Sequence, residues 1–125
     1  MPRVATSGFT NVLRAVLDTD FSWSAGDTGA KILALTENRD FFLPGPATDP
    51  AGNLPADGDF YDYLDPLGLV TGGLTITIHG GGYAIGGEPS TYVVAAPLVY
   101  IRFIFCSTPG IGSGGAWVVT TQALA

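Results

Sequence analysis

The amino-acid sequence predicts an all-β fold, as a single antiparallel β-sandwich or jelly roll with an extended N-terminal arm. The 125 residues include 18 glycines and nine prolines, which is typical of many short strands joined by tight turns. Segments of alternating apolar and polar residues recur along the chain, whereas helix-forming segments are scarce. The segment 98–106 is apolar on both of its faces, as expected of a central strand.

The length fits one domain with one core. We assign residues 1–17 to an N-terminal arm and first strand, and residues 18–125 to a β-sandwich domain with a long acidic loop at 45–59. Arms of this kind often become ordered only against a partner. Within the arm, the apolar residues of 11–17 fit helical spacing, but the β-rich surroundings favour a strand.

The first half of the domain contains clear strand signals. Phe21 and Trp23 alternate with polar residues, and residues 26–29 predict a turn with two glycines. Two further strands are predicted at 31–36 and at 41–44, the second ending at a proline. Residues 45–59 predict a surface loop, because they offer almost nothing to bury.

The second half begins with predicted strands at 60–64 and 74–79, separated by a turn at 66–73. In the second of these strands, Leu74, Ile76 and Ile78 are expected to face inward. The glycine run 80–87 predicts a hairpin tip. It lacks the following helix that a phosphate-binding loop requires.

The last part of the chain predicts three more segments. A strand at 92–96 leads into the central strand, and a loop at 107–115 leads to a strand at 116–121. We expect this last strand to pair antiparallel with residues 98–106. In total, roughly eight to ten strands are expected.

Charge and composition exclude several classes of function. Eleven acidic residues against five scattered basic ones give a net charge of −6, so no nucleic-acid partner is expected. The longest apolar stretch, about 15 residues interrupted by Pro97 and Arg102, is too short to span a bilayer, so no membrane partner is expected. The N-terminus has no apolar signal core, which predicts synthesis in the cytoplasm. Cys106 is the only cysteine, which excludes an intramolecular disulfide.

No residue pattern is typical of a catalytic site, and no cofactor is expected. Asp57, Asp59 and Asp62 are weak candidates for a cation site, but their spacing does not match a calcium-binding loop, and a solvated acidic loop is favoured. His79 has no nucleophile motif to serve, and no carboxylate pair is singled out for glycoside hydrolysis. Five aromatic residues offer either a sugar platform or core packing, and we favour the core: Trp23, Tyr61, Tyr63, Tyr83 and Trp117.

Several spaced signals together resemble one family. They are the segment 20–36 (Asp-Phe-Ser-Trp-Ser-Ala-Gly-Asp-Thr-Gly-Ala-Lys-Ile-Leu-Ala-Leu-Thr), Phe-Leu-Pro at 42–44, Gly-Leu-Thr-Ile-Thr-Ile at 73–78, the strand 99–105 and Gly-Ala-Trp-Val-Val at 115–119. This pattern resembles the small β modules of tailed-bacteriophage structural proteins. The chain departs from that pattern at Ala30, which lies between the turn glycine and the lysine.

The resemblance implies a non-enzymatic virion structural protein, made in the host cytoplasm and located on the virion surface. Its expected partners are further copies of itself, as a trimer, and the major capsid protein, which it would decorate or cement. The expected interface residues lie in the arm and in the last two strands: Val12, Leu13, Arg14, Val16, Tyr100, Arg102, Ile104 and Trp117.

Two other classes of function remain open from the sequence. The chain is alternatively a tail-fibre or tail-tip receptor-binding module, with Tyr83 and Glu88 at an exposed tip. A small glycan hydrolase is the third class, for which we find no dedicated residues.

Overall fold

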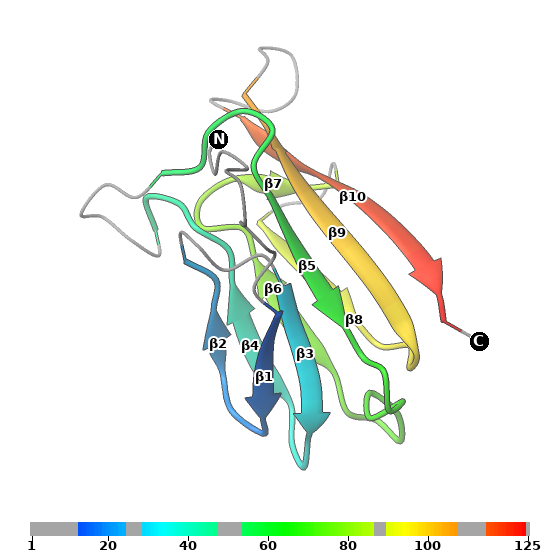
Figure 1. The fold of residues 1–125 in the computed structure, drawn as a ribbon. Helices are drawn as coiled ribbons and strands as arrows, with labels where there is room; N and C mark the ends of the chain where they lie inside the picture. Colours follow the sequence, from blue (N-terminus) through cyan, green and yellow to red (C-terminus); the bar gives the residue numbers. More distant parts are fainter. Residues whose placement is uncertain (1–12, 25–28, 48–53, 87–89, 108–114, 125) are drawn as a thin grey trace.

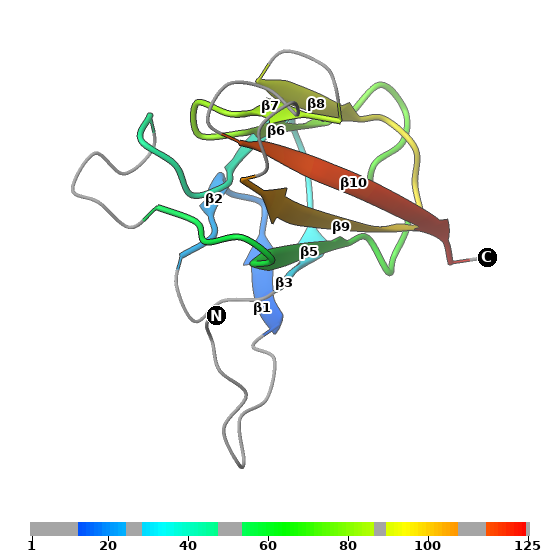
Figure 2. The same cartoon turned by 90° about the horizontal axis from the view of Figure 1, so that it is seen from above.

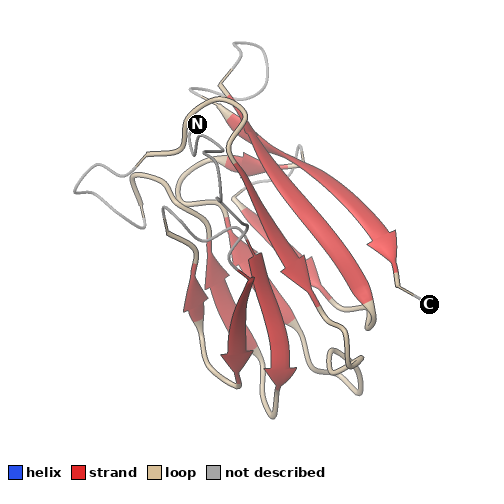
Figure 3. Cartoon of the chain, viewed as in Figure 1, coloured by secondary structure: helices blue, strands red, loops and turns tan. Residues whose placement is uncertain are grey.

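The computed structural model describes residues 13–24, 29–47, 54–86, 90–107 and 115–124. These residues form ten strands and no helix (Figure 3). The all-β class and the expected number of strands are therefore confirmed. The strands are β1 (Leu13–Leu17), β2 (Phe21–Ser22), β3 (Gly29–Ala34), β4 (Arg39–Phe42), β5 (Phe60–Leu64), β6 (Ile76–His79), β7 (Ala84–Ile85), β8 (Thr91–Val94), β9 (Val99–Cys106) and β10 (Ala116–Ala123).

The strands form two sheets that pack against each other in a sandwich-like arrangement (Figures 1 and 2). The six-stranded sheet has the order β1-β3-β5-β9-β10-β7, and the four-stranded sheet has the order β2-β4-β6-β8. One cluster of buried side chains from both sheets fills the space between them. The strand β1 lies at the edge of the six-stranded sheet, so the second part of the predicted arm is a sheet strand. Residues 1–12 lie outside the described residues.

The prediction of antiparallel sheets is wrong for most of the strand pairs. Five pairs are parallel and three are antiparallel, so both sheets are mixed. From β1 to β9, each connection carries the chain to the other sheet. Strands that are neighbours in one sheet, such as β1, β3 and β5, are therefore two apart in sequence and run in the same direction. The glycine-rich turn at 66–73, for example, joins β5 of one sheet to β6 of the other.

The segment 80–87 illustrates this difference. It does not fold as a hairpin tip, because β7 crosses to the six-stranded sheet and pairs parallel with β10. Gly81 adopts a left-handed φ of 71°, and its backbone lies so close to Gly45 that a Cβ on either residue would overlap the other. Close backbone approach, rather than anion binding, accounts for glycine at this position.

The central strand was predicted correctly. Strand β9 lies between β5 and β10, and it pairs antiparallel with β10 from Val99 to Cys106 as expected. Its residues Ile101, Phe103 and Phe105 are buried in the core. The aromatic residues are mainly core residues as well, since Trp23, Tyr61, Tyr63 and Trp117 are at most 3% exposed and Tyr83 is half-buried against the core.

A buried carboxylate fixes the turn after β5. Asp65 accepts hydrogen bonds from the backbone N–H groups of Leu69 and Val70, at 2.9 and 3.0 Å, and of Leu98 at 3.4 Å. These bonds satisfy a group whose burial would otherwise be costly. They also join the turn to the residue that precedes β9, and so they set where the central strand begins.

Candidate interaction surface

The face of the six-stranded sheet that points away from the core gathers the side chains of interest. We call it the outer sheet face. Alternation along β9 directs Tyr100, Arg102 and Ile104 to this side, opposite to the buried residues of the same strand. Strand register places Asp62 of β5 and Thr120 of β10 on either side of Arg102.

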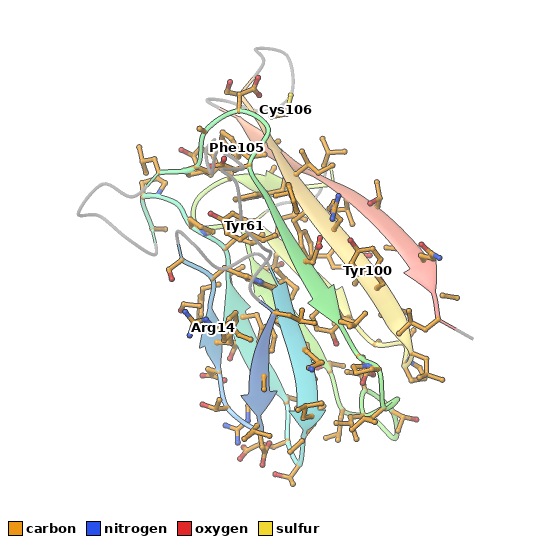
Figure 4. All side chains as sticks on the ribbon, viewed as in Figure 1. Arg14, Tyr61, Tyr100, Phe105 and Cys106 are labelled. Atoms are coloured by element: carbon orange, nitrogen blue, oxygen red, sulfur yellow. The ribbon has the colours of Figure 1, made fainter. Side chains whose placement is uncertain are left out.

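Two further rows of side chains cross this face, as the strand register shows. One row runs from Phe60 through Ile104 to Val118, and the other runs from Leu64 through Tyr100 to Gln122. Residues in such rows lie close enough to contact one another across the strands. Figure 4 shows Tyr100 on β9 in the middle of the sheet. The outer sheet face therefore comprises Leu13, Ala15, Lys31, Leu33, Phe60, Asp62, Leu64, Tyr100, Arg102, Ile104, Cys106, Val118, Thr120 and Gln122.

The centre of the outer sheet face is an ion pair between Arg102 and Asp62. Arg102 Nε lies 2.8 Å from Asp62 Oδ1, and a terminal guanidinium nitrogen lies 3.0 Å from Oδ2. This bidentate geometry is the strongest that the two groups form. The hydrogen bond to Asp62 raises the pKa of Arg102 above its ordinary value. The guanidinium carbon also lies 4.1 Å from the centre of the Phe60 ring, a cation–π contact. The two charges thus satisfy each other within the sheet.

Apolar side chains surround this ion pair. Phe60, Leu64 and Ile104 are each half-buried, and Val118 is 40% exposed. At the β1 edge, Leu13 is 45% exposed and lies over Gly29, where a Cβ would come within 2.5 Å of Leu13 Cδ1. The apolar surface therefore extends from β1 to β10.

Tyr100 belongs to the same cluster. Partial burial, followed by the hydrogen bond and charge of Asp62, raises the pKa of the Tyr100 hydroxyl above its ordinary value. The hydroxyl therefore stays neutral at physiological pH, and it adds no charge to the outer sheet face.

The structure does not bring all of the predicted interface residues together. Leu13, Tyr100, Arg102 and Ile104 lie on the outer sheet face. Val16 and Trp117 are 2% and 1% exposed, so their side chains belong to the core of the chain itself. Arg14 is an exposed residue of β1 (Figure 4), and Val12 lies outside the described residues.

The three carboxylates proposed for a cation have other partners. Asp62 is paired with Arg102, Asp57 Oδ1 accepts a hydrogen bond from Ser107 N at 2.9 Å, and Asp59 Oδ2 accepts one from Ala56 N at 2.8 Å. Over the part of the chain that the structure describes, no group of three or more His, Cys, Asp or Glu residues is arranged to hold a metal ion.

The remaining candidate residues lie apart from one another. His79 Nε2 lies 2.9 Å from Asp40 Oδ1, and its ring stacks on Phe42 with the centroids 4.8 Å apart. It belongs to the four-stranded sheet, whereas Cys106 ends β9 of the six-stranded sheet. Tyr83 packs edge-on against Phe105 at 4.8 Å, and Glu88 lies outside the described residues.

Known protein-family models and curated proteins were both compared with the chain, and neither comparison finds a match. Among the described residues, no helix is long and apolar enough to cross a membrane.

Sequence reasoning missed the pairing at the centre of the outer sheet face. It named Asp62 only as a weak candidate for a cation site and Arg102 as an interface residue, because the two are 40 residues apart and nothing local connects them. The sequence did contain one signal for this pairing, namely the positions of the two charged residues within their strands. Each residue is the one charged position in an otherwise apolar or aromatic strand, and oppositely charged residues of this kind often pair across neighbouring strands.

Proposed function

We propose that the chain is a non-enzymatic structural subunit that assembles with copies of itself through the outer sheet face. The observation that carries this proposal is an extended apolar face whose central charges already neutralise each other. The centre of this face can be buried without leaving an unpaired charge, which is the main cost of burying ionic groups. Lys31 lies towards the β1 edge, where its long side chain can keep the ammonium group in water. Burial of apolar surface contributes about 25 cal/mol per Å², so contact areas of ordinary size suffice for association.

The resemblance to tailed-bacteriophage structural modules supports a more specific proposal. In it, the subunits form a trimer on the virion surface and bind the major capsid protein as a decoration or cement protein. A threefold arrangement is heterologous, so the outer sheet face of one copy would contact a different surface of the next copy. Imaging of labelled protein on purified phage particles tests this location, and a label on the tail or on no particle would contradict it.

Substitution of Ile104 tests the role of the outer sheet face. Ile104→Lys places a charge among Phe60 and Val118 on the outer side of β9. We expect the variant to remain folded but to sediment as a monomer at concentrations where the unchanged chain is an oligomer, because an unpaired buried charge is costly. Sedimentation velocity over a range of concentrations measures the effect.

The matched control is Leu67→Lys. Leu67 is 60% exposed in the turn after β5 and is not part of the outer sheet face, so this variant adds the same charge elsewhere. We expect it to sediment as the unchanged chain does. An Ile104→Lys variant that still associates normally would show that the outer sheet face is not the contact.

A further inference from the structure

One side of the sandwich is open because the two sheets differ in width. The six-stranded sheet continues through β10 to β7, whereas the four-stranded sheet ends at β8. Strand β8 lies over β9, as shown by the contact between the Tyr92 and Phe103 rings at 5.8 Å. No described strand of the four-stranded sheet lies opposite the C-terminal half of β10, where Thr121 and Ala123 are exposed.

A groove of about 400 Å³ occupies this open side. Its floor and walls come from β8 and the residues after it, from β9 and from β10. All of the lining residues are uncharged, and most are aliphatic: Tyr92, Val93, Val94, Ala95, Ala96, Val99, Ile101 and Thr121. The groove therefore suits apolar side chains, since it offers no group that would pair with a charge.

The strand beside the groove has an unused backbone edge. Gly80 N donates to Ser90 O at 2.7 Å, and the register continues with Ile78 opposite Tyr92. In an antiparallel pair the bonding residues alternate, so Thr91, Val93 and Ala95 direct their N–H and C=O groups away from β6. No strand among the described residues pairs with this edge, because β8 is the last strand of its sheet.

Residues 91–95 of this edge also lack the usual protection against pairing, since the nearby Pro89 and Pro97 lie outside them. Proteins commonly place charged residues, prolines or bulges on exposed edge strands to prevent association. Here residues 89–101 contain no charged residue, and Arg102 is the only charged residue after Glu88, although the whole chain carries a net charge of −6. Strand β8 itself reads Thr-Tyr-Val-Val, which has high β propensity, and Val93 is 56% exposed.

We propose that the β8 edge and the adjacent groove bind one extended, uncharged segment of another protein by β-strand addition. The segment pairs with Thr91, Val93 and Ala95 through backbone hydrogen bonds. Every second side chain of the segment enters the groove, above Ile101 and Thr121, and should be aliphatic. Backbone pairing of this kind supplies affinity, and the groove supplies specificity.

The width of the open side favours a single strand over a second copy of this chain. A strand added to β8 lies over the C-terminal half of β10, which has no other cover among the described strands. If a second copy docked through its own β8, that strand would be the added one, and the β9 of the second copy would lie beneath it. That space is already occupied by β10 of the first copy.

Titration with a short peptide tests the proposal. The probe is the blocked pentapeptide acetyl-Ser-Val-Thr-Val-Ser-amide, added to isotope-labelled protein while amide chemical shifts are followed. We expect saturable shifts at Thr91, Val93 and Ala95. A peptide with proline in place of the central threonine lacks one backbone donor, and it should bind at least about tenfold more weakly. Equal binding of the two peptides, or the absence of saturable shifts, would overturn the proposal.

A variant of the edge provides the second test. Val93→Pro removes an N–H that points away from β6, so the ladder between β6 and β8 stays intact and the fold should be retained. We expect this variant to lose peptide binding at least about tenfold, while the matched Val93→Thr variant keeps it. Unchanged binding by a folded Val93→Pro variant would contradict strand addition.

Two further outcomes separate this proposal from others. Ile104→Lys should bind the peptide as the unchanged chain does, because Ile104 lies on the outer sheet face and not in the groove. Failure of the assembly proposal thus leaves this one standing. If Val93→Pro abolishes self-association and Ile104→Lys does not, the occupant of the edge is a second copy of this chain. That result would overturn the assignment to a segment of another protein.

Discussion

At the scale of single residues, Tyr63 carries a polar atom that the fold does not satisfy. Its side chain is 0% exposed, and its hydroxyl is buried without a hydrogen-bond partner among the described residues. Burial raises the pKa of this hydroxyl well above its usual range, so the group stays neutral. The ring itself packs against Phe41, with the centroids 6.0 Å apart. The aromatic ring, and not the hydroxyl, is therefore what the core requires.

Tyr63→Phe should leave the protein as stable as before, or more stable by about 1 kcal/mol, because it removes an unsatisfied buried group. Tyr63→Leu, the control, should lower the free energy of unfolding by removing ring contacts. Urea unfolding curves measure both variants. A loss of more than about 1 kcal/mol in Tyr63→Phe would show that the hydroxyl has a stabilising partner.

Asp18 is the second residue with a testable role. It adopts a left-handed φ of 60°, and its carboxylate accepts hydrogen bonds from Thr36 N and from the Thr36 hydroxyl. These bonds, together with Arg39 at 3.2 Å, lower the pKa of Asp18 below its ordinary value. Because the folded pKa is the lower one, the charged form stabilises the fold above about pH 4, and this contribution is lost as the pH falls through the folded pKa.

Asp18→Asn isolates this charge, since asparagine has nearly the same shape and tolerates the left-handed conformation. We expect the variant to be less stable than the unchanged chain at pH 7, and the difference to be lost as the pH falls below about 4 and through the lowered pKa of Asp18. Thermal unfolding of both proteins at a series of pH values measures it. A difference that stays constant across this range would rule out the charge as the cause.

At the scale of elements, β9 contributes central side chains to both sides of the six-stranded sheet. Phe103 is 0% exposed and contacts both Trp23 and Tyr92. Phe103→Asp should abolish folding, because it buries an unpaired carboxylate at the centre of the core. Loss of the dispersed amide spectrum would show this.

The control for that variant lies on the neighbouring strand. Thr120 is exposed on the outer sheet face, opposite Arg102 in the register. Thr120→Asp introduces the same side chain on the other side of the sheet, and the variant should fold. A folded Phe103→Asp variant would show that the core does not depend on the inner side of β9.

The elements also show how far the sequence predicts the structure. Strand positions were predictable: β5 occupies Phe60–Leu64 as expected, and β10 pairs antiparallel with β9. Which strands lie beside one another in the rest of the two sheets was not predictable. A glycine-rich connection has the same composition whether it closes a hairpin or crosses to the other sheet. The parallel pairing of β1, β3 and β5 is decided by long-range packing, which alternation within each strand does not encode.

The candidate surface was predictable only in part. The two apolar sides of β9 indicated that its outer residues would need cover, and Tyr100, Arg102 and Ile104 do share one face. The partner of Arg102 was not predictable, since Asp62 lies on a strand that nothing in the local sequence places beside β9. Burial of Val16 and Trp117 was also missed, because an apolar residue in a strand suits a core and an interface equally.

At the scale of the whole molecule, the chain carries more apolar surface than its two sheets bury between them. The two sheets bury one side of β9, and its other side remains half-exposed with Phe60, Leu64 and Val118 around a neutralised ion pair. A contiguous apolar patch on a small protein commonly marks an interaction site. The same feature explains why a chain with a net charge of −6 is expected to associate: its charges lie mostly away from β9 and β10.

The molar mass of the purified chain in solution tests this central claim most directly. Light scattering coupled to size exclusion, at micromolar concentration and physiological salt, should give a mass well above the 12.9 kDa of one chain, and three times that value for the proposed trimer. A stable particle of 12.9 kDa at every concentration, with the outer sheet face open to water, would contradict the account.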